Sequence, residues 1–134
     1  MEITRRTDYA IRLMLALAEA GGGPISVREL AERQQVPYPF ARGIQRDLVA
    51  AGLATTKRGA AGGLCLARPA LEISLLDVIE AIEGPIALNI CTADPEWCQR
   101  MGACSVHQVW RGADDLVKQY FRSKSLAGLV EGKE

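Results

Sequence analysis

The strongest constraint on the fold of this chain is a glycine-rich segment at residues 59–63, between two stretches of strand character. Residues 53–58 and 64–67 carry the apolar and β-branched side chains typical of strands, and glycines between them allow the chain to reverse tightly. Two basic residues, Lys57 and Arg58, stand where the first strand ends. The pattern predicts a β-hairpin with a basic tip.

Three helices are predicted before this hairpin. Apolar residues recur at helical spacing over residues 4–20, and a glycine run with a proline ends that helix. Ser26 and Glu29 form a capping-box pattern that opens a second helix to about residue 34. The third helix covers residues 39–51, with Phe40, Ile44 and Leu48 at helical spacing. The sequence therefore predicts a mainly helical winged helix-turn-helix with a small β-hairpin as the wing.

The second half of the chain predicts a helix, an irregular loop and a long helix. A capping pattern at residues 74–77 opens a helix to about residue 83, and residues 85–104 then show no periodicity. Residues 105–123 form a long helix whose apolar stripe comprises Val106, Val109, Ala113, Leu116 and Tyr120. Residues 125–130 add one last helical turn. We therefore divide the chain into 1–84, the winged helix; 85–104, a loop; and 105–134, the long helix with its tail.

Charge is unevenly distributed along a chain whose net charge is zero. Residues 1–68 hold ten Lys and Arg against six Asp and Glu, and residues 69–134 hold six against ten. A basic first half indicates a nucleic-acid-binding face there. No apolar run approaches the roughly 20 residues that span a membrane, and the first residues lack the apolar core of a secretory signal. We expect a cytoplasmic protein with no membrane partner.

The third helix is the expected recognition element, because a helix fits the major groove and its first residues face the base edges. Arg42 is placed to pair with guanine, and Gln45 to read adenine or bind a phosphate. We expect Arg46, Lys57 and Arg58 to contact phosphates. The predicted DNA-binding residues are Tyr38, Pro39, Arg42, Gln45, Arg46, Lys57 and Arg58. The alternatives are ordinary exposed charges, or a winged helix that binds protein.

Three of the four cysteines, Cys91, Cys98 and Cys104, fall within 14 residues and are followed by His107, the single histidine. In a reducing cytosol such a cluster indicates a metal or redox site and not disulfides. Gaps of six and five residues are wider than the spacing of structural zinc sites and favour an iron–sulfur cluster. Zinc binding or a thiol switch remains the alternative. Cys65, between two leucines, is predicted to be a packing residue.

Four motifs together resemble the Rrf2 family of bacterial winged-helix regulators. They are Thr4 with Tyr9-Ala10, the 58–63 wing, the 74–79 helix opening and the three-cysteine loop. The resemblance implies a homodimer held by the long C-terminal helix, and two winged helices on a pseudo-palindromic operator in double-stranded DNA. It also implies a [2Fe–2S] or [4Fe–4S] cluster bound by the three cysteines, which makes residues 85–104 the cluster-binding loop.

The fourth ligand is left open between His107 and Asp8. His107, three residues after Cys104, resembles the histidine ligand of the family's iron–sulfur-assembly regulators. Asp8 resembles the aspartate that the partner subunit supplies in the family's nitric-oxide-sensing repressors. The function expected is a cluster-dependent transcription regulator, a repressor and not an enzyme, that senses redox state, nitric oxide or iron supply. A cluster-free thiol-switch or zinc-binding regulator of the same fold is the alternative.

Overall fold

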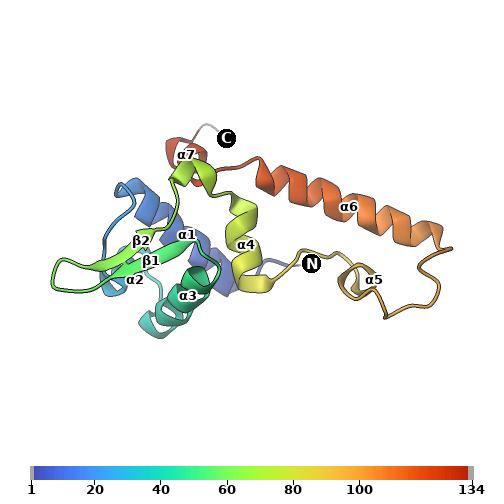
Figure 1. Ribbon diagram of the computed structural model, residues 1–134, viewed down its shortest axis with the longest axis horizontal. Helices are drawn as coiled ribbons and strands as arrows, with labels where there is room; N and C mark the ends of the chain where they lie inside the picture. The colour runs from blue at the N-terminus through green and yellow to red at the C-terminus, as the bar shows by residue number, and fades with distance from the viewer. Residues whose placement is uncertain (1, 133–134) are drawn as a thin grey trace.

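The computed structural model describes residues 2–132. Its elements are α1 (Arg5–Glu19), α2 (Val27–Gln34), α3 (Tyr38–Ala50), β1 (Ala54–Lys57), β2 (Gly63–Leu66), η1 (Ala70–Glu72), α4 (Leu75–Glu83), α5 (Ile90–Ala93), α6 (Ser105–Arg122) and α7 (Leu126–Glu131). Figure 1 shows helices α1–α4, the hairpin and α7 gathered into one body, from which α6 projects as a long arm. The short helix α5 lies beside the far end of this arm.

The main core is built around α1. Leu13, Met14 and Leu17 are buried on one side of α1 and pack in the same cluster as Ile44 and Leu48 of α3. Their three- and four-residue spacing puts them on one face of each helix, which is why burying that face fixes the helices against one another. A smaller cluster of Leu76, Ile79 and Ile86, backed by Val117 and Phe121, holds the base of α6 against α4.

Side-chain caps begin most of the helices, whereas α3 starts after Pro37 without one. Ser74 accepts a hydrogen bond from Asp77 N–H, and the Asp77 carboxylate accepts one from Ser74 N–H, which completes a capping box. The box predicted at Ser26 is only half formed. The Ser26 hydroxyl accepts from Glu29 N–H, but the Glu29 carboxylate pairs instead with Arg33, one turn further along α2, at 3.1 Å. That i,i+4 ion pair competes for the same carboxylate.

The predicted hairpin is present, with β1 and β2 antiparallel and Ala54 opposite Leu66. An isolated bridge between Ile25 and Leu64 ties the hairpin to the segment before α2. Gly63, at φ 147°, makes this approach possible, because a Cβ there would collide with the backbone of Ile25. Cys65 is buried in β2, as predicted for a packing residue.

Two details differ from the sequence predictions. Phe40 is about half exposed and lies edge-on to Tyr9, while the small Ala41 takes the buried position on α3. The 85–104 loop contains the helical turn α5. Cys104 caps the long helix, which begins at Ser105 as predicted. Within residues 2–132, no helix combines the length and apolarity needed to cross a membrane.

The C-terminal turn is part of the body. Leu126 at the start of α7 is fully buried in the main core, and its N–H donates to the carbonyl of Ile73. Helix α7 packs against α1 and η1. The long helix is therefore anchored to the body twice, by α4 through the smaller core and by α7 through the main core.

Candidate nucleic-acid interface and cysteine site

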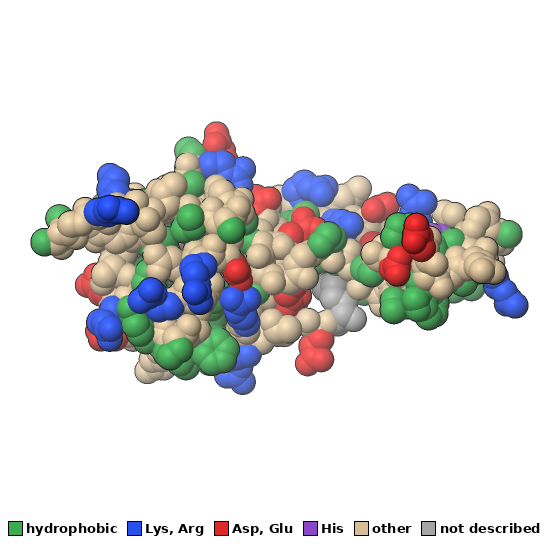
Figure 2. Space-filling model, turned by 60° about the horizontal axis from the view of Figure 1, so that its bottom comes forward, with side chains coloured by type: hydrophobic (Ala, Val, Ile, Leu, Met, Phe, Trp, Pro, Cys, Tyr) green, Lys and Arg blue, Asp and Glu red, His purple; other side chains and the backbone are tan. Residues whose placement is uncertain are grey.

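An open groove of about 490 Å³ lies between the start of α2, the face of α3 and the wing. It is lined by Ser26, Val27, Arg28, Tyr38, Arg42, Gln45, Thr56, Lys57, Gly59, Gly62, Gly63 and Leu64. Figure 2 shows Lys and Arg side chains gathered over the wing end of the molecule, whereas acidic side chains are more frequent toward the arm. Such a basic concavity suits a polyanion.

The predicted DNA-binding residues are distributed over this region. Tyr38, Arg42, Gln45 and Lys57 line the groove itself. Arg46, one residue beyond Gln45, lines an adjoining hollow together with Arg42 and Gln45. Pro39 lies in the first turn of α3, and Arg58 is exposed in the wing turn just after Lys57.

Tyr38 is the centre of a three-residue contact at the mouth of the groove. The Arg42 guanidinium donates from Nη1 to the Tyr38 hydroxyl at 3.3 Å. The Arg28 guanidinium lies over the Tyr38 ring, 4.0 Å from its centroid. The hydrogen bond from Arg42, and the positive charge of both arginines, hold the pKa of Tyr38 below its ordinary value of 10.0.

Sequence reasoning did not single out Arg28, which lines the same groove. Its position in the first turn of α2 was an available signal, because the first helix of a helix-turn-helix crosses the DNA backbone. Arg6 serves the fold instead, since it pairs with Asp47 at 2.6 Å and so joins α1 to α3. Gly43 leaves room for this contact, because a Cβ there would lie 3.3 Å from Nη2 of Arg6.

Two polar contacts hold the cysteine segment, residues 85–104, against α6. Asp114, only 5% exposed, accepts a hydrogen bond from Leu88 N–H at 2.8 Å. Two turns nearer the start of α6, Nδ1 of buried His107 lies 3.3 Å from Sγ of Cys91. His107 and Asp114 are seven residues apart, which puts both on the same face of the helix. Residues 88–91 are therefore fixed to α6 by its two buried polar side chains.

Cys104 lies at the same end of α6. Its thiol accepts the His107 N–H at 3.4 Å in place of the usual hydroxyl or carboxylate cap. Cys91, Cys104 and His107 are thus brought together, but Cys98 shares none of these contacts and is half-buried in the loop between them. Among the described residues, no three His, Cys, Asp or Glu side chains stand close enough to hold a metal ion.

Asp8, the alternative ligand, lies in the first turn of α1. Its carboxylate is exposed and pairs with Arg12 Nε at 3.6 Å, so within this chain it belongs to the winged-helix body and not to the cysteine site. The same helix start binds the end of α4: Oε1 of Glu83 accepts from Thr4 N–H at 2.9 Å and from the Thr7 hydroxyl at 2.7 Å. Burial opposes the Glu83 charge, but these hydrogen bonds outweigh it and lower the pKa of Glu83 below 4.5.

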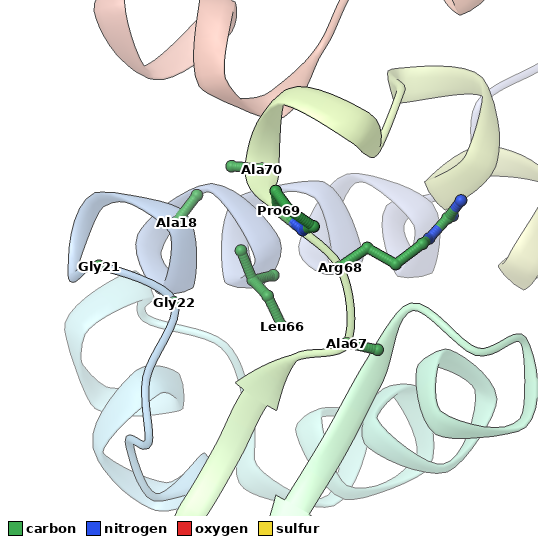
Figure 3. A pocket seen from close by; sticks show the side chains of 8 residues that line it. All are labelled: Ala18, Gly21, Gly22, Leu66, Ala67, Arg68, Pro69 and Ala70. Atoms are coloured by element: carbon green, nitrogen blue, oxygen red, sulfur yellow. The ribbon is translucent and has the colours of Figure 1, made fainter.

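A separate hollow of about 520 Å³ lies between the end of α1 and the segment after β2. Figure 3 shows its small lining residues and the Arg68 side chain, which extends away from them. The Arg68 guanidinium pairs at 3.6 Å with Asp77 of α4. The hollow thus presents mainly alanine, glycine and backbone surface, which offers little to hold a charged ligand.

The arm helix leaves an apolar face uncovered. The described residues Val106, Val109, Leu116 and Tyr120 are each more than half exposed, although they belong to the stripe predicted for packing. Their spacing of three, seven and four residues is typical of a helix that packs along another helix. An uncovered apolar stripe of this length marks a surface for association.

Three helices, the third of them a basic recognition helix, are followed by a basic wing. This arrangement defines the class of the molecule as a winged helix-turn-helix transcription regulator. The family described as "Rrf2: Iron-dependent Transcriptional regulator" matches residues 3–132. The chain belongs to the Rrf2 family, as predicted from its motifs.

Relatives agree with this assignment. The HTH-type transcriptional regulator IscR of Photorhabdus laumondii is 30% identical over 135 residues, covering 100% of this chain and 82% of that protein. The structure of IscR from T. potens is similar over 100% of this chain and 89% of the IscR chain, with 27% sequence identity and a TM-score of 0.78. The structure of CymR, the global cysteine regulator of B. subtilis, is similar over 100% of this chain and 99% of the CymR chain, with 26% sequence identity and a TM-score of 0.80. The predicted winged-helix fold is confirmed by these likenesses, and regulation of transcription is a non-enzymatic role.

Proposed function

We propose that this protein is a cytoplasmic, homodimeric regulator of transcription that binds an iron–sulfur cluster. Its affinity for operator DNA would depend on the state of that cluster in residues 85–104. The observation that carries the proposal is the contact between Cys91 and His107, 3.3 Å apart although 16 residues separate them in sequence. Cys104 accepts the backbone N–H of the same histidine, so both thiols contact His107 at the end of the arm, one through its ring and one through its backbone.

The donor set suits such a cluster. Thiolates are the usual ligands of iron–sulfur clusters, and an imidazole replaces a thiolate in some of them. Cys91, Cys104 and His107 would hold the cluster together with Cys98, which lies in the loop that joins Cys91 to Cys104. When bound, the cluster would supply an inorganic centre that responds to oxidants, nitric oxide or iron supply.

The protein side of the switch is a chain of contacts from the cysteine segment to the DNA-binding body. Leu88 is held by Asp114, and α6 rests on α4 through the smaller core. Glu83 at the end of α4 is bonded to Thr4 and Thr7 at the start of α1, the helix that supports α3. A change of order at residues 85–104 would therefore reach the recognition helix through packed elements.

A second copy of the chain is the proposed cover for the exposed stripe of α6. Two copies joined there would present two recognition helices to DNA, and a two-fold dimer matches a pseudo-palindromic operator with half-sites about 34 Å apart. Repression follows if the operator overlaps a promoter.

Anaerobic purification tests the cluster. We expect coloured protein that contains both iron and acid-labile sulfide, and we expect Cys98→Ala to lose the visible absorption and most of the iron. Cys65→Ala is the matched control, because it removes a thiol that is buried in β2 and should leave the colour intact. If Cys98→Ala keeps wild-type colour and iron, the ligand assignment is wrong.

The same preparation separates the two candidates for the fourth ligand. Loss of the native visible spectrum in His107→Ala, with Asp8→Ala unchanged, would assign His107. The reverse result would assign Asp8, reaching across the dimer. Neither replacement removes a thiol, so each isolates one candidate.

A cluster-free thiol switch is the second candidate function. It is favoured by the separation of Cys98 from the other donors and by the likeness to CymR, a cysteine regulator. In that case the anaerobic protein would be colourless and free of iron, with either zinc or three reactive thiols. DNA binding would then change on oxidation of the thiols and not on removal of iron.

A further inference from the structure

We infer that Tyr38 positions two arginines that contact DNA. It orients Arg28 toward a backbone phosphate and holds Arg42 where it can contact a base. The inference rests on the DNA binding stated above. It adds one contact residue, Arg28, and gives Tyr38 a positioning role in place of a direct base contact.

The two arginines differ from Arg6 and Arg33 in how they are held. Arg6 pairs with Asp47 and Arg33 with Glu29. Among residues 2–132, neither Arg28 nor Arg42 has a carboxylate partner within salt-bridge distance; both are instead held by Tyr38. A guanidinium oriented by an aromatic ring keeps its full positive charge available to an outside anion, whereas one bound to a carboxylate does not.

The contact with the Tyr38 ring leaves N–H donors of Arg28 available to an outside anion. Cζ of Arg28 lies 4.0 Å from the centroid of the Tyr38 ring, and a guanidinium carries five N–H donors, more than its contact with Tyr38 can occupy. Arg28 is exposed in the first turn of α2 and lines the groove, on the side that crosses the DNA backbone in a helix-turn-helix. Its role is therefore a phosphate contact.

Arg42 lies further from the ring, with Cζ 5.9 Å from the centroid, and is held by the phenol oxygen. One N–H of Arg42 donates to Tyr38 from the next turn of α3, and the remaining donors of its fork are free for a guanine edge. Fixing a long, flexible side chain before binding lowers the entropy lost when it contacts a base. The hydroxyl of Tyr38 is thus expected to sharpen base preference, while the ring beneath Arg28 contributes to affinity.

Selection of duplexes from a randomised double-stranded DNA library, using the full chain, provides the operator and the base preference at each position. Arg28→Ala is expected to bind the selected operator about five- to tenfold more weakly at 0.1 M salt, with the slope of log K against log[salt] reduced by about one. Arg33→Ala is the matched control, since it removes the same charge from an exposed position of α2 outside the groove. It should leave the slope unchanged.

Tyr38→Phe keeps the ring and removes only the hydroxyl. It is expected to broaden the preference at the base position that Arg42→Ala also broadens, with the salt slope unchanged. In the double variant the loss should be no greater than in Arg42→Ala alone, because the hydroxyl acts through Arg42. Circular dichroism and thermal melting confirm that each variant is folded.

Two results would overturn the inference: an Arg28→Ala variant indistinguishable from Arg33→Ala, or a Tyr38→Phe variant with the wild-type base preference. Failure of the wild-type protein to enrich any sequence would instead refute the proposed regulatory function itself. The two kinds of failure are therefore told apart within one experiment.

Discussion

At the scale of single residues, Asp114 is one of the two side chains of α6 that hold residues 88–91 against it. Its carboxylate is the buried acceptor for Leu88 N–H, three residues before Cys91. Asp114→Ala would leave that N–H without its partner, and we expect a loss of about 1–3 kcal/mol in the free energy of unfolding. Asp114→Asn keeps an acceptor oxygen and should lose less. Denaturant unfolding of the three proteins measures the difference.

Asp115, the next residue along α6, provides the control. It is exposed, so Asp115→Ala should change the free energy of unfolding by no more than about 0.5 kcal/mol. Equal losses of unfolding free energy at the two positions would mean that the hydrogen bond to Leu88 adds nothing to stability. The effect would then come only from removing a negative charge from the helix.

At the scale of elements, Glu83 joins the end of α4 to the start of α1. Its carboxylate accepts hydrogen bonds from Thr4 and Thr7, where the positive end of the helix dipole also favours a negative charge. Because these bonds lower the pKa of Glu83 below 4.5, the charge stabilises the folded state above that pH. Its contribution is lost as the pH falls through the lowered pKa. Denaturation midpoints of Glu83→Gln should therefore lie below wild type at pH 7, and the two should converge in acid.

Glu19, at the opposite end of α1, is the matched control for this effect. A carboxylate near the negative end of the dipole gains nothing from it, so Glu19→Gln should be neutral or slightly stabilising at pH 7. A Glu83→Gln difference that stays constant from pH 7 down to strong acid would contradict the role given to the charge.

At the scale of the whole molecule, the proposed dimer depends on the exposed stripe of the arm helix. Leu116 is 69% exposed in the middle of the apolar stripe of α6. A carboxylate in the centre of a helix–helix interface would be buried without a partner, so Leu116→Glu should convert a dimer to monomers. Sedimentation velocity measures this directly. Operator binding should weaken at the same time, because the second half-site no longer gains from the first.

Arg111→Glu tests whether any added acidic charge has this effect. Arg111 is exposed five residues before Leu116, about 140° around the helix, and this variant should remain dimeric. A wild-type protein that sediments as a monomer at micromolar concentration would contradict the proposed dimer.

Much of the fold could be predicted locally. Capping residues such as Ser74 and Asp77, glycines at the turns and three-to-four spacing of leucines act over a few residues, and these signals placed the helices within about one residue and the hairpin on the correct segments. Where two local signals competed, the prediction was wrong. Glu29 pairs with Arg33 and not with the backbone, and Ala41 takes the core position expected for Phe40 because the recognition helix faces outward at residue 40.

The sequence by itself determined that three short helices and a basic wing would form, and that three cysteines and a histidine would fall within one short stretch. Only the tertiary structure decided that Cys91 contacts His107, that Asp114 holds the segment before Cys91, and that Arg28 joins Arg42 on Tyr38. Helix caps, turns and the i,i+4 contact of Arg42 with Tyr38 depend on neighbours in sequence, whereas the contacts of Cys91, Leu88 and Arg28 depend on how separate elements pack. Their partners lie up to 26 residues apart, a relation that no local pattern encodes.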